Sequence, residues 1–162
     1  GGSLEHASIR DVVRGKDGTP GSLLGTIVYG GSRMGTVEKN TEAGIFGQIA
    51  EGEPDWSAAV PVGYMQDVET GLASIRCCAD GQIKEYDIEI LTADIATDSY
   101  KGLVLQVSDP ELLSLTGGIV QGMSGSPIIQ NGKLVGAVTH VFIRDSTKGY
   151  GIFLEKMLEQ SY

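Results

Sequence analysis

Short apolar runs, separated by glycine, asparagine and aspartate, dominate the pattern of hydrophobic and polar positions along this chain. The strands that these runs predict lie at residues 12–13, 23–29, 45–49, 60–65, 72–78, 83–91 and 103–107. Short strands at regular spacing, joined by glycine-rich turns, are typical of a β-sandwich or a β-barrel. Because strands do not alternate with helices, the pattern gives no support to a parallel sheet. The sequence therefore predicts an all-β fold.

Two local signals refine the strands that precede residue 91. Asp80-Gly81 separates two of the apolar runs, and this dipeptide between strands predicts a β-hairpin. Residues 86–90 read Tyr-Asp-Ile-Glu-Ile, so apolar and acidic side chains alternate. Because successive side chains of a strand point to opposite faces, this strand is expected to have one face in solvent.

Two stretches have helical features. Residues 109–114 begin with Asp109 and place Pro110 at the first helical position, which favours the start of a helix. Residues 152–160 carry Phe153, Met157 and Leu158 at helical spacing. The prediction is therefore a β-barrel or sandwich with a short C-terminal helix.

Composition limits the size and the partners of this protein. The 162 residues, of which 41% are hydrophobic, suffice for one domain or two small lobes with a buried core. The net charge is -9 and the acidic residues are dispersed, so the basic footprint of a nucleic-acid-binding protein is missing. The apolar runs are far shorter than the roughly 20 residues that a membrane-spanning helix needs.

The N-terminal end and the two histidines carry further expectations. Gly1-Gly2-Ser3 resembles a remnant of cloning, so residues 1–6 are expected to be a disordered start before a domain of residues 7–162. His6 and His140 have no ligand partner at helical or turn spacing, and no glycine-rich loop ends in Lys-Ser or Lys-Thr. We therefore expect no metal site and no cofactor.

Residues 122–127, which read Gly-Met-Ser-Gly-Ser-Pro, carry the candidate chemistry. Glycines near Ser124 let the backbone turn sharply and point the N–H groups of Gly122 and Ser124 toward one spot, where a tetrahedral oxyanion would be held. Asn131-Gly132 predicts a two-residue turn in a hairpin over residues 128–138. These features make Ser124 a candidate nucleophile. The alternative is a plain Gly/Ser turn that joins two strands.

Residues 116–142, which read TGGIVQGMSGSPIIQNGKLVGAVTHVF, closely resemble the stage IV sporulation protein B (SpoIVB) peptidases of endospore-forming bacteria. The resemblance extends upstream to about Ala7. It rests also on Asp145 and on residues 15–21, 40–41, 44–47, 86–90, 149–151 and 157–158. It implies a chymotrypsin-like double β-barrel that could be incomplete at its N-terminal end, with lobes at roughly 7–95 and 96–162.

The resemblance implies a serine endopeptidase that is secreted across the forespore membrane into the space between the two membranes around the forespore. There it would cleave a regulator of an intramembrane protease, which in turn activates a late sigma factor. Members of the family also cleave themselves. They carry a membrane anchor and a PDZ domain before the peptidase region, and neither is expected within these 162 residues. Membrane association is therefore expected only through an anchor outside the chain.

The family pattern also implies roles for individual residues. Ser124 matches the nucleophile, and Asp109 matches the proposed acid of the catalytic triad. An acid shortly before the serine is unlike the order in chymotrypsin, but triads are recognised by geometry and not by order along the chain. Asp109 could instead, or in addition, cap the helix that starts at Pro110. Asp87 and Asp67 are fallback candidates for the acid, although each fits an exposed strand face or a turn better.

In chymotrypsin-like peptidases the segment after the nucleophile hairpin forms a wall of the substrate pocket, which here implies Val138, Thr139 and His140. The general base of the family lies in a Gly-His segment that precedes the part matched by this chain. His6 follows Glu5 and is therefore a poor match. Because a serine hydroxyl is a weak nucleophile without a base, we expect this chain to be inactive or weakly active. The alternative is an inactive binding or regulatory module on the same barrel.

Overall fold

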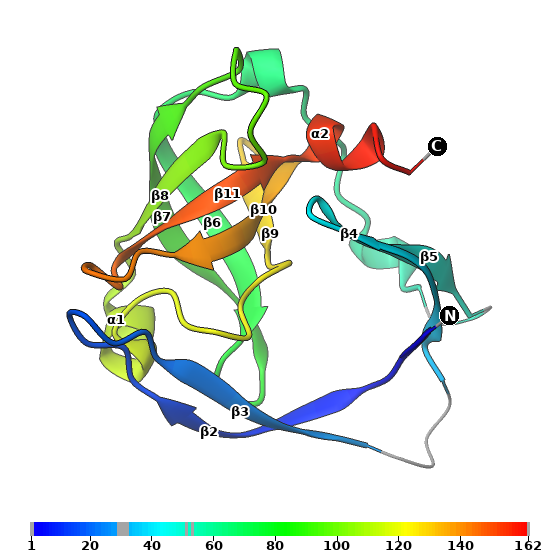
Figure 1. Ribbon diagram of the computed structural model, residues 1–162, viewed down its shortest axis with the longest axis horizontal. Coiled ribbons are helices and arrows are strands. Elements are labelled where there is room, and N and C mark those ends of the chain that lie inside the picture. Colours follow the sequence, from blue (N-terminus) through cyan, green and yellow to red (C-terminus); the bar gives the residue numbers. More distant parts are fainter. Residues whose placement is uncertain (1, 29–32, 51, 53, 162) are drawn as a thin grey trace.

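A closed, six-stranded antiparallel barrel forms the body of the structure (Figure 1). The computed structural model describes residues 2–28, 33–50, 52 and 54–161. The strands of the barrel follow the order β10-β11-β8-β7-β6-β9, and β9 closes the circle on β10. Their bounds are β6 Gly71–Cys78, β7 Ile83–Ala93, β8 Leu103–Val107, β9 Pro127–Gln130, β10 Lys133–Val141 and β11 Lys148–Phe153.

Two small open sheets from the N-terminal third of the chain accompany the barrel. The strands β1 (Gly2–Leu4), β4 (Gly35–Thr41) and β5 (Gly44–Ile49) pair in the order β1-β4-β5, and β2 (Ala7–Val13) pairs with β3 (Ser22–Ile27). Figure 1 shows the β4–β5 hairpin extending toward the barrel. The all-β prediction is therefore confirmed, with one closed barrel among the described residues.

The barrel unites strands from both of the lobes that the family resemblance implies. β7 pairs with β8, with Ile88 opposite Val107 and Ala93 opposite Leu103. Ile88 and Leu103 are both 0% exposed and belong to the same core. The predicted boundary at 95–96 therefore falls inside the barrel, between two paired strands, and the predicted lobes of 7–95 and 96–162 do not correspond to the sheets that form.

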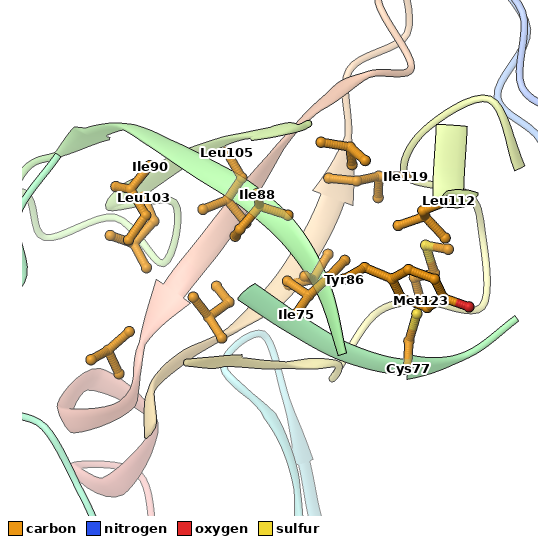
Figure 2. Close-up of a cluster of buried hydrophobic side chains, with 14 of the residues drawn as sticks. Ile75, Cys77, Tyr86, Ile88, Ile90, Leu103, Leu105, Leu112, Ile119 and Met123 are labelled. Carbon is orange, nitrogen blue, oxygen red and sulfur yellow. The ribbon is translucent and has the colours of Figure 1, made fainter. Parts of the chain in front are cut away.

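Apolar side chains from all six strands fill the barrel (Figure 2). The alternation predicted for residues 86–90 is confirmed, because Tyr86, Ile88 and Ile90 are buried while Asp87 and Glu89 are exposed. Each fully buried side chain of this size contributes roughly 1.5–3 kcal/mol relative to an exposed one. The inward-facing side chains of the barrel strands therefore stabilise the fold.

Both predicted hairpins are present. β6 pairs with β7 across Asp80-Gly81, where Gly81 has a φ of 89° and the Asp80 carboxylate accepts a hydrogen bond of 3.1 Å from the N–H of Gln82. β9 pairs with β10 across Asn131-Gly132, whose φ angles are 52° and 73°. Two successive positive φ angles are typical of a type I′ turn, which asparagine followed by glycine adopts readily. Turn chemistry therefore sets both registers.

The two predicted helices are also present. α1 (Pro110–Thr116) begins as predicted, with Asp109 as its N-cap. α2 (Leu154–Leu158) begins later than predicted, because Ile152 and Phe153 are the last residues of β11 and are each 1% exposed. Within the described ranges, neither helix is long and apolar enough to span a membrane.

The sequence did not predict three of the strands. β11 contains glycines, which have low β propensity but allow close approach, since a Cβ at Gly149 would lie 2.5 Å from the carbonyl oxygen of His140. β4 is polar over residues 38–40 and so lacks an apolar run. β1 contradicts the predicted disordered start, because Gly2–Leu4 pairs with β4. Gly1 lies outside the described residues.

The strand predicted at 60–65 is wrong. Pro61 has no N–H group to donate to a sheet, and Val62 forms a single isolated bridge with Leu134. The N–H of Gly63 then donates to the carbonyl of Leu134 at 2.8 Å, so this segment runs along β10 without becoming a strand of the barrel. The strand predicted at 23–29 ends earlier than expected, and its last position lies outside the described residues.

The Tyr86 side chain provides a test of core packing. Its ring reaches toward Cys77 and Met123 in Figure 2, and its hydroxyl has no hydrogen-bond partner among the described residues. Burial raises the pKa of this phenol. Because an unpaired buried polar group costs about 1–3 kcal/mol, Tyr86→Phe is expected to raise the free energy of unfolding by about 1 kcal/mol in urea denaturation. The exposed control Tyr64→Phe should stay within about 0.5 kcal/mol of the parent. A loss of stability in Tyr86→Phe would show that the hydroxyl is hydrogen-bonded.

Candidate active site

The loop between α1 and β9 holds the candidate nucleophile, and the two glycines on either side of this serine have backbone angles that other residues rarely adopt. Gly122 has a φ of 101° and Gly125 a φ of 91°. At Gly125 an added Cβ would meet no atom within 4 Å, so the requirement for glycine is purely conformational. At Gly122 an added Cβ would also come within 3.1 Å of the Cβ of Leu23 in β3. Between these glycines, Ser124 is exposed to solvent.

Backbone hydrogen bonds fix this loop to β10. The N–H of Gly125 donates to the carbonyl of Val138 at 2.8 Å, and the N–H of Val138 donates to the carbonyl of Ser126 at 3.0 Å. Met123 anchors the loop to the barrel core, because its side chain is only 1% exposed and packs there. Its sulfur also accepts a hydrogen bond of 3.5 Å from the N–H of Val120. Met123 therefore has a structural role that its sequence context did not reveal.

The predicted oxyanion hole rests on two backbone amides of this loop. In the part of the chain that the structure describes, the N–H groups of Met123, Gly125 and Ser126 donate to backbone carbonyls, but those of Gly122 and Ser124 donate to none. Two unpaired amides next to an exposed hydroxyl are the donors that a tetrahedral oxyanion needs. The arrangement is compatible with the predicted role of Gly122 and Ser124.

The hydroxyl of Ser124 already has a partner on β10. It donates a hydrogen bond of 2.7 Å to the carbonyl oxygen of Thr139. The pairing of β10 with β11 shifts between Val138 and His140, so this bulge leaves Thr139 without an opposite residue and its carbonyl free for Ser124. A carbonyl oxygen orients the hydroxyl but is far too weak a base to take its proton, so Ser124 is positioned but not activated.

Ser124 lines a cleft of about 420 Å³. Val138, Thr139 and His140, which the sequence assigned to the substrate pocket, line this cleft together with Ser124. The structure therefore brings the predicted nucleophile and the predicted pocket residues together. It also shows residues 41–45 in the lining of the cleft. No local pattern predicts this position next to the nucleophile, although the family resemblance includes part of this segment.

The turn between β4 and β5 forms part of the cleft because it docks on the barrel. Ala43, at the tip, is 4% exposed and packs with Ala137 of β10 and Ile152 of β11. Its neighbour Gly44 has a φ of 141°, and an added Cβ there would lie 3.0 Å from the terminal methyl of Met157 in α2. The tip therefore has little room to change its position relative to the barrel.

Asp109 lies at the start of α1 and does not line this cleft. One carboxylate oxygen accepts hydrogen bonds from the N–H groups of Glu111 at 2.9 Å and Leu112 at 3.0 Å, and the other accepts one from the N–H of Asp87 at 3.3 Å. The alternative role of Asp109 as a helix cap is therefore confirmed, and its role as triad acid remains a prediction. Among the fallback acids, Asp87 is exposed on β7, and Asp67 lies 3.9 Å from Lys133.

Of the two histidines, only His140 lines the cleft of Ser124. His6 lies between β1 and β2, and its carbonyl accepts a hydrogen bond from the N–H of Val28. His140 is exposed on β10 and lines the cleft. Among the described residues, no imidazole is hydrogen-bonded to the hydroxyl of Ser124.

A closed antiparallel barrel that presents an exposed serine on a glycine-flanked loop is typical of the chymotrypsin-like class of serine peptidases. Within that class, this chain belongs to the SpoIVB peptidase family, because the family model described as SpoIVB peptidase S55 matches residues 1–158. The match includes Gly1-Gly2-Ser3, which resembles a remnant of cloning in the sequence.

Two solved structures are similar in fold. The crystal structure of the active form of the Rv3671c protease from M. tuberculosis is 16% identical, with a TM-score of 0.57, and the similarity covers 92% of this chain and 66% of that one. Its inactive form is 18% identical, with a TM-score of 0.53 and coverage of 84% and 70%. The chain thus spans slightly less than two thirds of the active-form structure. No curated protein matches this chain. These similarities confirm the predicted chymotrypsin-like fold.

The hydroxyl of Ser124 is expected to be unreactive in this chain. Without a base, its labelling by a fluorophosphonate probe should be about 10⁴-fold slower than in a peptidase with a complete triad. Mass spectrometry of the intact protein measures the reaction, with Ser124→Ala as the blank. Rapid labelling that persists in His6→Ala but disappears in His140→Ala would contradict the prediction and identify His140 as the base.

The cap formed by Asp109 predicts a loss of stability when its carboxylate is removed. Asp109→Ala is expected to lower the free energy of unfolding by about 1 kcal/mol, whereas Asp109→Ser should retain most of it, because serine is also a good N-cap. Asp87→Ala, a change at an exposed carboxylate that caps no helix, should stay within about 0.5 kcal/mol of the parent. Urea denaturation measures all three variants, and an unchanged Asp109→Ala would exclude the cap as a stabilising contact.

Proposed function

We propose that this chain is the peptidase domain of a sporulation serine endopeptidase with Ser124 as its nucleophile. One observation carries the proposal: in a member of the SpoIVB peptidase family, Ser124 is exposed at a cleft, on a loop whose neighbouring amides have no partner among the described residues. Acyl transfer is the chemistry that such a hydroxyl and such amides serve.

The reaction follows from these groups. The Ser124 oxygen attacks the carbonyl carbon of the scissile peptide bond while an imidazole takes the hydroxyl proton, and the N–H groups of Gly122 and Ser124 hold the resulting oxyanion. Collapse of this intermediate breaks the C–N bond, and the leaving amine receives the proton from the imidazolium. Water then hydrolyses the acyl-enzyme by the same steps, with the imidazole again acting as base.

The imidazole comes from the Gly-His segment of the family, outside these 162 residues. Two observations support this. His6 lies between two strands of the N-terminal sheets and is not among the residues that line the cleft, and the hydroxyl of Ser124 is occupied by a backbone carbonyl and not by His140. The chain described here is therefore inactive or weakly active by itself.

The substrate and the location rest on family membership. The substrate is a regulator of an intramembrane protease, and its cleavage leads to activation of a late sigma factor. The protein also cleaves itself. It acts in the space between the membranes around the forespore and is held there by an anchor outside the chain. It needs no cofactor or nucleic acid.

A second candidate is an inactive binding or regulatory module. The hydrogen bond from Ser124 to the carbonyl of Thr139 favours it, because a hydroxyl in this state is not activated. The glycines at 122 and 125, with their positive φ angles, favour the peptidase, since a module without catalytic function has no need of that loop conformation.

The two candidates differ in what a longer chain can do. We define the extended chain as one of the same protein that includes the Gly-His segment. It is expected to cleave a peptide from the regulator, and Ser124→Ala should lower kcat by about 10⁴-fold or more. Ser114→Ala, on the exposed face of α1, is the matched control and should leave the rate unchanged. Peptide cleavage is followed by mass spectrometry. An extended chain that binds the regulator peptide but does not cleave it would favour the binding module.

A further inference from the structure

The hairpin of β2 and β3 is fastened to the segment that precedes the nucleophile. At its turn, which lies beside α1 in Figure 1, the N–H of Gly15 donates to the carbonyl of Thr116 at 2.9 Å. At the start of β3, the N–H of Gln121 donates to the carbonyl of Gly21 at 2.9 Å, and the N–H of Leu23 donates to the carbonyl of Gln121 at 2.8 Å. Gln121 therefore pairs with the outer edge of β3 as a single parallel bridge.

The carbonyl of Gln121 belongs to the same peptide group as the N–H of Gly122. A peptide group is planar and trans, so its C=O and N–H bonds point in opposite directions. The hydrogen bond from Leu23 holds this carbonyl toward β3, and the N–H of Gly122 therefore points away from β3. Among the described residues this N–H donates to no backbone carbonyl. One contact thus fixes the direction of an amide that the proposed reaction needs.

The opposite orientation of this peptide group is unfavourable. If the group turned over, the N–H of Gly122 would face the N–H of Leu23, so two donors would meet and neither would have an acceptor. The Leu23 side chain also packs closely here, since a Cβ at Gly122 would lie 3.1 Å from the Cβ of Leu23. The base of the hairpin is tightly closed, because Gly21 is buried and a Cβ there would lie 2.2 Å from the carbonyl oxygen of Val13. The donor at residue 23 is therefore held in place.

We propose that Leu23 is a positioning residue of the reaction, because its N–H group holds the Gln121–Gly122 peptide in the orientation that builds the oxyanion hole. This assignment rests on the proposed peptidase function. The backbone hydrogen bonds that tie the loop to β10 join Gly125 and Ser126 to that strand, so they leave this peptide group to the β2–β3 hairpin. Leu23 acts through the peptide group and not on the substrate itself.

The first measurement is made on the 162-residue chain itself. Residual dipolar couplings report the direction of the Gly122 N–H bond relative to the barrel, and in the parent they should fit a bond that points away from β3. Leu23→Pro removes the donor, so the coupling of Gly122 should change. The coupling of Met123, whose N–H has its own acceptor in the loop, should stay the same. Leu23→Ala keeps the donor and should preserve both couplings.

The second measurement is the rate of peptide cleavage by the extended chain. An oxyanion donor acts on the transition state, so its loss lowers kcat by about 10²- to 10³-fold and changes KM little. Leu23→Pro is therefore expected to lower kcat for the regulator peptide by about 10²-fold. Leu23→Ala removes side-chain packing but keeps the N–H group, so its kcat should exceed that of the proline variant by at least about 10-fold.

Gly25→Pro is the matched control, because the N–H of Gly25 lies on the same edge of β3 as that of Leu23. Successive N–H groups of a strand point to opposite edges, and among the described residues the N–H of Gly25 donates to no carbonyl outside the hairpin. A Cβ at this position would lie 3.6 Å from the nearest atom, the carbonyl oxygen of Ser8, which is an ordinary contact. The kcat of this variant should stay within about threefold of that of the parent.

The outcomes separate this proposal from the proposed function. If Leu23→Pro does not fold, an ester bond between Ser22 and Leu23 removes the same N–H group without a ring, and the same results are expected. A folded variant without this N–H group whose Gly122 coupling matches the parent would overturn the assignment. So would equal losses of kcat in Leu23→Ala and Leu23→Pro. An extended chain that cleaves no regulator peptide would contradict the proposed function, and the couplings would still decide whether Leu23 orients the amide.

Discussion

The hydrogen bonds between the nucleophile loop and β10 are the constraint on which the rest of the site depends. Gly125 and Ser126 exchange backbone hydrogen bonds with Val138, and the hydroxyl of Ser124 reaches the carbonyl of Thr139 one residue further. The bulge in β10 makes this last contact available, because it leaves Thr139 without a partner on β11. Together these bonds set the position of Ser124 at the cleft that β10 helps to line, and among the described residues the N–H groups of Gly122 and Ser124 donate to no backbone carbonyl.

The barrel makes this arrangement rigid. Met123 is buried in the same core as Tyr86 and Ile75. Packing therefore anchors the loop to the core, in addition to the hydrogen bonds that tie it to β10. The cleft takes its second wall from a distant part of the chain, since the β4–β5 turn docks through Ala43. A catalytic group keeps its geometry only when the surrounding packing fixes it, and here two independent contacts do so. What the chain does not provide, among its described residues, is an imidazole bonded to Ser124.

Local chemistry explains what could be predicted from the sequence. The Asn131-Gly132 turn, the alternation over residues 86–90 and the cap at Asp109 each depend on neighbours in the chain, and the structure contains all three. The strand β11 and the approach of the β4–β5 turn to Ser124 depend on partners that are far away in sequence. No local pattern therefore predicts them. The predicted strand at 60–65 was wrong for the same reason, because its apolar residues serve a single bridge to β10. The nucleophile loop and the β10 wall of its cleft were predictable, whereas the part of the cleft formed by residues 41–45 was not.

The most direct test of this account is a crystal structure of the extended chain with a peptide boronic acid, which forms a tetrahedral adduct with an activated serine. The account predicts a bond from boron to the oxygen of Ser124, with one boronate oxygen about 2.7–3.1 Å from the backbone nitrogens of Gly122 and Ser124. An adduct on another residue would contradict it. So would an adduct on Ser124 whose oxygens point away from both amides.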